Sequence, residues 1–157
     1  MHSRSQASHT FQTGSAAVEL AFILPMLLVF LTAVFFISRV TWHYTAAQKA
    51  ATDAARYLSS ISTQEMREPE LAEHARNVAL AIVQMEMADL NPGGRAPRIE
   101  IFCGEDACDG FGSRPLPETV EVRIKMDMVD PLHIFDTGRY GVPLTVNATM
   151  AYVGGGL

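Results

Sequence analysis

The sequence lacks charge over one long stretch, because no Asp, Glu, Lys or Arg occurs from residue 20 to residue 38. An α-helix needs about 20 predominantly apolar residues, at roughly 1.5 Å each, to cross the hydrocarbon core of a bilayer. A buried core helix would need a domain large enough to enclose it, and the remaining residues are too few for that. We therefore expect residues 20–37 to form a membrane-spanning helix.

An excess of positive charge is also absent. Residues 41–157 carry 10 Lys or Arg against 16 Asp or Glu. A surface that binds nucleic acid needs a basic face to neutralise phosphates, and no such face is visible. We therefore do not expect nucleic acid as a partner.

Catalytic and cofactor-binding patterns are missing as well. There is no nucleophile elbow, phosphate-binding loop or dinucleotide fingerprint, and the histidines show no metal-binding spacing. The histidines are His2, His9, His43, His74 and His133. Glu105, Asp106 and Asp109 stand in a glycine-rich loop, where acids are more often solvated than catalytic or calcium-binding. We expect neither enzyme activity nor a cofactor or metal.

Cysteine is limited to Cys103 and Cys108, with four residues between them. A structural zinc site usually takes four ligands from paired motifs, and no second pair exists. In an oxidising compartment this spacing can close a small disulfide loop, and otherwise the two residues would be free thiols. We expect the disulfide if the chain after the apolar run is exported.

A cleaved secretory signal is the main alternative to a membrane anchor. Such a signal has a basic start, roughly 7–15 apolar residues and a cleavage site of small residues. Here Arg4 is the only Lys or Arg before the apolar run, the run is longer, and residues 39–44 do not form a small-residue cleavage site. We therefore expect the helix to be retained.

Two residues are unusual for a simple anchor. Glu19 stands at the rim of the expected helix, where a carboxylate either lies among lipid headgroups or has a specific partner. Pro25 removes one helical hydrogen bond and predicts a kink, which a spanning helix tolerates.

The residues upstream favour a specific partner for Glu19. The sequence from Gly14 through Ser15 to Glu19 resembles the processing site of type IV pilins and pseudopilins. The resemblance implies that a prepilin peptidase cuts between Gly14 and Ser15 and removes residues 1–14 as a leader. The new α-amine would lie four residues before the Glu19 carboxylate on one helical face, where it could neutralise its own Glu19 or that of the next subunit.

The match becomes more specific further along the chain. Its residues are Val18, Glu19, Ala21 and Pro25, followed by an alanine-rich helix that ends in Ala-Arg at residue 56. This pattern resembles TadE/TadF-like minor pseudopilins of the tight-adherence (Flp) pilus, and the specific resemblance covers about residues 14–58. Major Flp pilins are much shorter and have Glu-Tyr where this chain has Glu-Leu, so a major pilin is not implied.

The resemblance implies a structural subunit that supports surface adhesion and biofilm formation. Its expected partners are the prepilin peptidase, other pilin and pseudopilin subunits, the inner-membrane assembly platform and the lipid bilayer. Residues 1–14 would be cytoplasmic and the chain after about residue 40 periplasmic, with incorporation into an extracellular pilus left open. The alternatives are a pseudopilin of a type II secretion or DNA-uptake system, and an uncleaved single-span protein with a periplasmic binding domain.

The first helix is expected to continue past the bilayer to about residue 58. Apolar residues with alternating spacings of three and four form one stripe of this helix: Ile37, Val40, Tyr44, Ala47, Ala51, Ala54 and Leu58. The opposite side is expected to carry Arg39, His43, Gln48, Lys49 and Asp53. The small alanines allow close packing, and the protein's own domain is their expected partner.

A capping-box pattern at residues 62–65 predicts a single helical turn, and Pro69 suits the first turn of a second helix. We expect that helix to run to about residue 90. Its expected apolar stripe is Leu71, Ala75, Val78, Ile82 and Met85.

From residue 98 onward the apolar period changes to two in three segments, near residues 99–103, 120–128 and 144–152. Such alternation is typical of an antiparallel sheet with one wet face. The expected fold class is α+β: a long transmembrane and amphipathic helix over residues 15–60, then a small domain over residues 61–157. In that domain the second helix packs on a three- to four-stranded antiparallel sheet.

Overall fold

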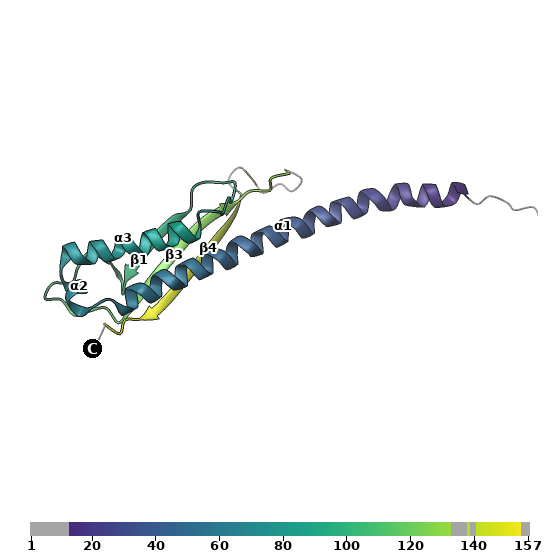
Figure 1. Ribbon diagram of the computed structural model, residues 1–157. Coiled ribbons are helices and arrows are strands. Elements are labelled where there is room, and N and C mark those ends of the chain that lie inside the picture. The colour runs from purple at the N-terminus through teal and green to yellow at the C-terminus, as the bar shows by residue number, and fades with distance from the viewer. Residues whose placement is uncertain (1–12, 133–137, 139–140, 155–157) are drawn as a thin grey trace, which may run out of the picture. The chain divides into compact units, whose positions relative to one another are not determined.

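The computed structural model describes residues 13–132, 138 and 141–154 (Figure 1). The chain divides into two compact units, Met1–Ser38 and Arg39–Leu157, which are called unit 1 and unit 2 below. One helix, α1, runs from Thr13 to Ser60 and contributes residues to both units. Of the expected leader, residues 1–12 lie outside the described residues.

Unit 2 has two further helices and a four-stranded sheet. The helices are α2 (Thr63–Arg67) and α3 (Pro69–Glu86). The strands are β1 (Arg98–Cys103), β2 (Asp106–Ala107), β3 (Thr119–Met128) and β4 (Val142–Ala151). Their order is β2-β1-β3-β4, and every neighbouring pair is antiparallel. The α+β fold class is therefore confirmed, and the three strand segments lie where the alternation predicted them.

The predicted helix starts at Ser62 and Pro69 are confirmed. Ser62 is the N-cap of α2: its hydroxyl accepts from the backbone N–H of Glu65 at 3.2 Å, and its own N–H donates to the Glu65 carboxylate at 2.8 Å. This reciprocal pair satisfies two N–H groups that a helix start otherwise leaves without partners. Pro69 then begins α3, where its missing N–H costs no helical hydrogen bond.

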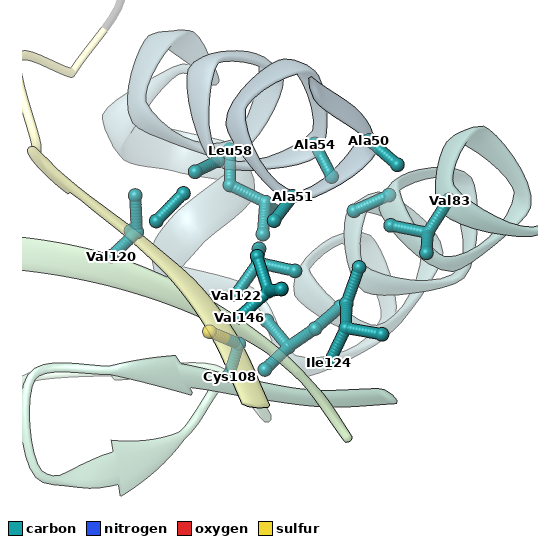
Figure 2. Close-up of a cluster of buried hydrophobic side chains, with 14 of the residues drawn as sticks. Ala50, Ala51, Ala54, Leu58, Val83, Cys108, Val120, Val122, Ile124 and Val146 are labelled. Carbon is teal, nitrogen blue, oxygen red and sulfur yellow. The ribbon is translucent and has the colours of Figure 1, made fainter. Parts of the chain in front are cut away.

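The core of unit 2 lies between the sheet and the helices that cover one of its faces (Figure 2). From β3, alternate residues point into it and none is more than 3% exposed: Val120, Val122, Ile124, Met126 and Met128. From α1, five alanines have no exposed surface: Ala47, Ala50, Ala51, Ala54 and Ala55. Alanines leave room for the helix backbone to approach the sheet closely, so the small-residue stripe packs against the protein's own domain as expected.

The inward face of α1 differs in part from the predicted stripe. Ala47, Ala51, Ala54 and Leu58 are buried as predicted. Tyr44, however, is 44% exposed, whereas His43, which we expected on the opposite side, is only 5% exposed. The His43 ring lies against the preceding turn, with Nδ1 2.8 Å from the carbonyl oxygen of Arg39.

The stripe predicted for α3 is confirmed at Ala75 and wrong at its two ends. Leu71 and Met85 are 39% and 78% exposed, whereas the buried residues of α3 are Ala72, Ala75, Ala79 and Val83. Ile82 packs against the core while partly exposed. Mostly small side chains face inward, because alanines let α3 lie close to its neighbours.

The connection after β1 is closed by a disulfide between Cys103 and Cys108, with a Cα–Cα distance of 5.1 Å. Both cysteines are at most 2% exposed. Further along the same connection, the N–H groups of Phe111 and Gly112 donate to the carbonyl oxygens of Met66 and Arg67. The disulfide loop is thereby joined to α2, and the short strand β2 forms inside it.

Candidate processing and assembly segment

Gly14, Ser15 and Glu19 lie in the first turns of α1. The helix begins at Thr13, so the Gly14–Ser15 peptide bond belongs to its first turn. The first four N–H groups of a helix have no intrahelical partner, so this turn opens more easily than the interior. Residues four apart are neighbours on a helix surface, which puts the backbone nitrogen of Ser15 below the Glu19 side chain.

Glu19 is exposed, and no charge near it in the sequence compensates it. From residue 5 to residue 38 it is the only Asp, Glu, Lys or Arg. A partner for its carboxylate would come from outside the described residues, from another molecule or from solvent. Within the described part of the chain, the lack of an ion pair distinguishes Glu19 from acids of unit 2 such as Asp53 and Glu86, which both contact Lys49.

The apolar surface that follows Glu19 is unburied on every side. The large apolar residues from Val18 to Leu31 are 41–79% exposed, with Phe22 at 77% and Met26 at 79%. Within the described residues, α1 is the one helix long and apolar enough to cross a membrane. Exposure of so much apolar surface to water would cost roughly 25 cal/mol for each Å², whereas lipid removes that cost.

The few polar groups in this segment are satisfied locally. The Thr32 hydroxyl donates to the carbonyl oxygen of Leu28 at 2.6 Å, and the Ser38 hydroxyl donates to that of Val34 at 2.8 Å. A lipid environment offers no partner for such groups, so internal bonding is what a spanning helix requires.

Pro25 stands inside α1, and the helix continues past it. A proline at this position cannot donate to the carbonyl oxygen of Ala21, four residues earlier. The carbonyl oxygen of Ala21 therefore loses its usual helical donor. The kink at Pro25 stays a prediction.

The acids of the disulfide loop in unit 2 lie beside an arginine. Asp106 and Asp109 lie 3.3 Å and 3.7 Å from the guanidinium of Arg114, and the two cysteines are bonded to each other. No group of three or more His, Cys, Asp or Glu suited to a metal occurs among the residues the structure describes. Of the histidines, His74 is exposed and His43 is buried, whereas His2, His9 and His133 lie outside the described residues.

Comparison with known protein families gives a match over the first helix. Residues 14–56 match the family model for TadE-like protein. The matched segment starts at Gly14 and ends at Arg56, so it contains the whole apolar stretch and the alanine-rich continuation of α1. The resemblance to TadE-like proteins is confirmed over these residues. No curated protein and no solved structure matches the chain.

Proposed function

We propose that this chain, TadE-like over residues 14–56, is a minor pilin or pseudopilin subunit of a tight-adherence (Flp) pilus. Its role is structural: it initiates, caps or anchors the filament and so supports surface adhesion and biofilm formation. The observation that carries the proposal is the coincidence of three features in one segment. The family match begins at Gly14, the only charge nearby is Glu19, and the helix that follows is apolar and unburied.

In this proposal a prepilin peptidase cuts between Gly14 and Ser15. The cut creates a positive α-amine at Ser15, one helical turn before Glu19. A charged side chain at the centre of a bilayer costs about 2.5–3.5 kcal/mol on insertion scales, and less near the rim. Pairing of the amine with Glu19 of the same or a neighbouring subunit offsets part of this cost and aligns the helices of neighbouring subunits.

The proposed location is the bacterial inner membrane, with residues 1–14 in the cytoplasm and unit 2 in the periplasm. The disulfide between Cys103 and Cys108 supports this orientation, because disulfides persist in the periplasm and are rare in the cytoplasm. Its partners there are other pilin and pseudopilin subunits, which pack along the apolar helix, and the assembly platform that lifts subunits out of the membrane.

Mass spectrometry of the mature N-terminus tests the processing step. Co-expression with a prepilin peptidase should give a chain that starts at Ser15, and Gly14→Val should leave the leader attached. Ala16→Val is the matched control, because it places the same valine side chain two residues after Gly14, and it should still be processed. An intact leader on the wild-type chain in the presence of the active peptidase would refute the proposal.

Assembly can be separated from processing at Glu19. Glu19→Gln keeps the size of the side chain and removes its charge, so cleavage should continue while co-purification with other pilus subunits falls.

Deletion of the gene identifies the pilus or secretion system that the protein serves. Loss of Flp pili supports this proposal, whereas loss of protein secretion or DNA uptake with normal pili favours the corresponding pseudopilin role.

A further inference from the structure

Arg39 connects three parts of unit 2 at one end of the sheet. Its guanidinium donates to the carbonyl oxygen of Val129 at 3.1 Å and also to that of Asn91. Gly93 pairs with Met128 through an isolated β-bridge, and Val142 pairs with Met128 in the β3–β4 ladder. We call this region, residues 39–44, 91–98, 125–132 and 141–145, the Arg39 end.

The distance of Arg39 from the bilayer follows from its covalent connection to the charge-free stretch. Arg39 comes directly after Ser38, the last residue of the charge-free stretch. If that stretch spans a bilayer, Arg39 lies at the bilayer surface, because one helical residue adds only about 1.5 Å. The carbonyl groups of residues 91 and 129 then lie within one arginine side chain of that surface.

Exposed large apolar side chains gather at the Arg39 end. Four of the exposed large apolar residues described in unit 2 belong to it: Trp42 (69%), Tyr44 (44%), Leu132 (62%) and Val142 (39%). Trp and Tyr are enriched where proteins meet lipid headgroups, since their rings have an apolar body and a polar group. These four residues come from three separate segments of the chain, residues 39–44, 125–132 and 141–145.

The Arg39 end also provides cations next to these apolar side chains. A surface hollow of about 230 Å³ is lined by Arg95, Arg98 and Lys125, by the acid Asp127, and by other parts of β3 and β4. The Lys125 ammonium lies 2.9 Å from the Glu100 carboxylate, so Arg95 and Arg98 are the cations considered below. At the opposite end of the sheet, Asp106 and Asp109 of the disulfide loop lie beside the guanidinium of Arg114. Arg95 and Arg98 belong to the end of unit 2 at which Arg39 follows the charge-free stretch.

We propose that the Arg39 end of unit 2 docks on the surface of an anionic phospholipid bilayer. Leu132 and Trp42 enter the headgroup region, and Arg95 and Arg98 bind lipid phosphates. The inference rests on the membrane span of the proposed function and adds a resting state to it. Before assembly, unit 2 is held against the membrane by its own surface as well as by its helix. Extraction of the subunit into a filament has to break both attachments.

Depth-dependent fluorescence quenching tests the docking on the full chain reconstituted in vesicles that contain phosphatidylglycerol. The lipids carry bromine near the start of the acyl chain. Trp42 is the only tryptophan, so a Trp42→Phe background accepts one new probe at a time. Leu132→Trp places the probe at the Arg39 end, and Val153→Trp places it at the other end, where the Val153 N–H donates to Ser59.

Docking predicts at least threefold stronger quenching for the probe at residue 132 than for the probe at residue 153. Equal, weak quenching at both positions would overturn the proposal, because it would mean that unit 2 stands clear of the lipid. Leu28→Trp in the same Trp42→Phe background places a probe inside the apolar span, where residue 28 is 57% exposed, and absence of its quenching would count against the membrane insertion on which both proposals depend. Thermal melts of both probe variants verify that they fold.

The contribution of the cations is tested in the Leu132→Trp background. Arg95→Glu together with Arg98→Glu should lower quenching by about half, whereas Arg56→Glu, an exposed arginine near the other end of α1, should not. Replacing phosphatidylglycerol with phosphatidylcholine, or adding salt at about 0.5 M, should mimic the double variant because both weaken attraction to phosphates. Quenching that is unchanged by all of these would overturn the role assigned to the phosphates.

Discussion

The two parts of α1 are one helix with opposite designs. In unit 1 it is built from large apolar residues that are exposed, such as Phe22 and Phe35 at 77% and 73%. In unit 2 it is built from alanines with no exposed surface, such as Ala51 and Ala54. Large side chains suit a surface that fluid lipid can surround, whereas small ones suit a surface that a fixed sheet and helix must approach closely. The two environments are therefore distinguished by the size of the apolar side chains as well as by the lack of charge from residue 20 to residue 38.

The largest expected effect comes from placing a charge in the apolar part. Leu28→Arg should make insertion less favourable by about 3 kcal/mol, because the residue is 57% exposed to the expected lipid. Thr45→Arg, on an exposed position of α1 in unit 2, should insert normally. Alkaline extraction of membranes measures the inserted fraction of each. Equal insertion of both variants would contradict the assignment of lipid to the first part alone.

Enlarging an alanine of α1 should lower stability in unit 2 and have no such effect in unit 1. Ala51→Leu forces three extra carbons into a fully buried position and should lower the free energy of unfolding by about 1–3 kcal/mol. Ala21→Leu makes the same change at an exposed position of unit 1 and should leave the stability of unit 2 unaltered. Thermal unfolding in detergent compares them. A stable Ala51→Leu variant would mean that the α1–sheet contact is looser than described.

The Cys103–Cys108 disulfide should affect the stability of unit 2 alone. Replacing both Cys103 and Cys108 with alanine reopens a short loop, which by the chain-entropy relation should lower the stability of unit 2 by about 2 kcal/mol. The helical content contributed by unit 1 should not change. Denaturant unfolding followed by near-ultraviolet and far-ultraviolet circular dichroism measures the two units together. Loss of the far-ultraviolet helical signal from unit 1 would show that the two units are coupled.

The smallest expected effect concerns the cap of α2. Hydrogen bonds from the Ser62 hydroxyl and backbone N–H hold the pKa of the Glu65 carboxyl below its ordinary value of 4.5. A lowered pKa in the folded state means that the stabilisation is present above about pH 4.5 and is lost as the pH falls through the folded value. Ser62→Ala should cost about 1 kcal/mol at neutral pH and have less effect in acid.

Ser60→Ala is the control for the cap. The Ser60 hydroxyl donates within its own helix to the carbonyl oxygen of Tyr57 at 2.9 Å, so this substitution should leave the pH dependence as it is in the wild type. Melting temperatures at pH 7 and pH 3 for the two variants provide the measurement. A penalty for Ser62→Ala that is the same at both pH values would mean that Glu65 takes no part in the cap.

The candidate processing segment was predictable from the sequence because it depends on covalent order. The spacing between Gly14, Ser15 and Glu19 is the same in any helix, and the charge-free stretch is continuous in the sequence. Cleavage after Gly14 and pairing of the new α-amine with Glu19 stay predictions, and mass spectrometry of the mature N-terminus tests the cleavage. The Arg39 end was not predictable, since no local pattern indicates that Arg39 meets the carbonyl groups of residues 91 and 129.

The sequence by itself determined the apolar span, the three long strands, the Ser62 cap and the start of α3 at Pro69. Each depends on residues within a few positions of one another, through hydrophobic periodicity or capping. Only the tertiary structure decided which side of α3 faces inward, that His43 is buried, and that the short strand β2 forms inside the disulfide loop. The physical reason is that packing selects side chains by the space between two surfaces, and that space exists only after both surfaces are in place.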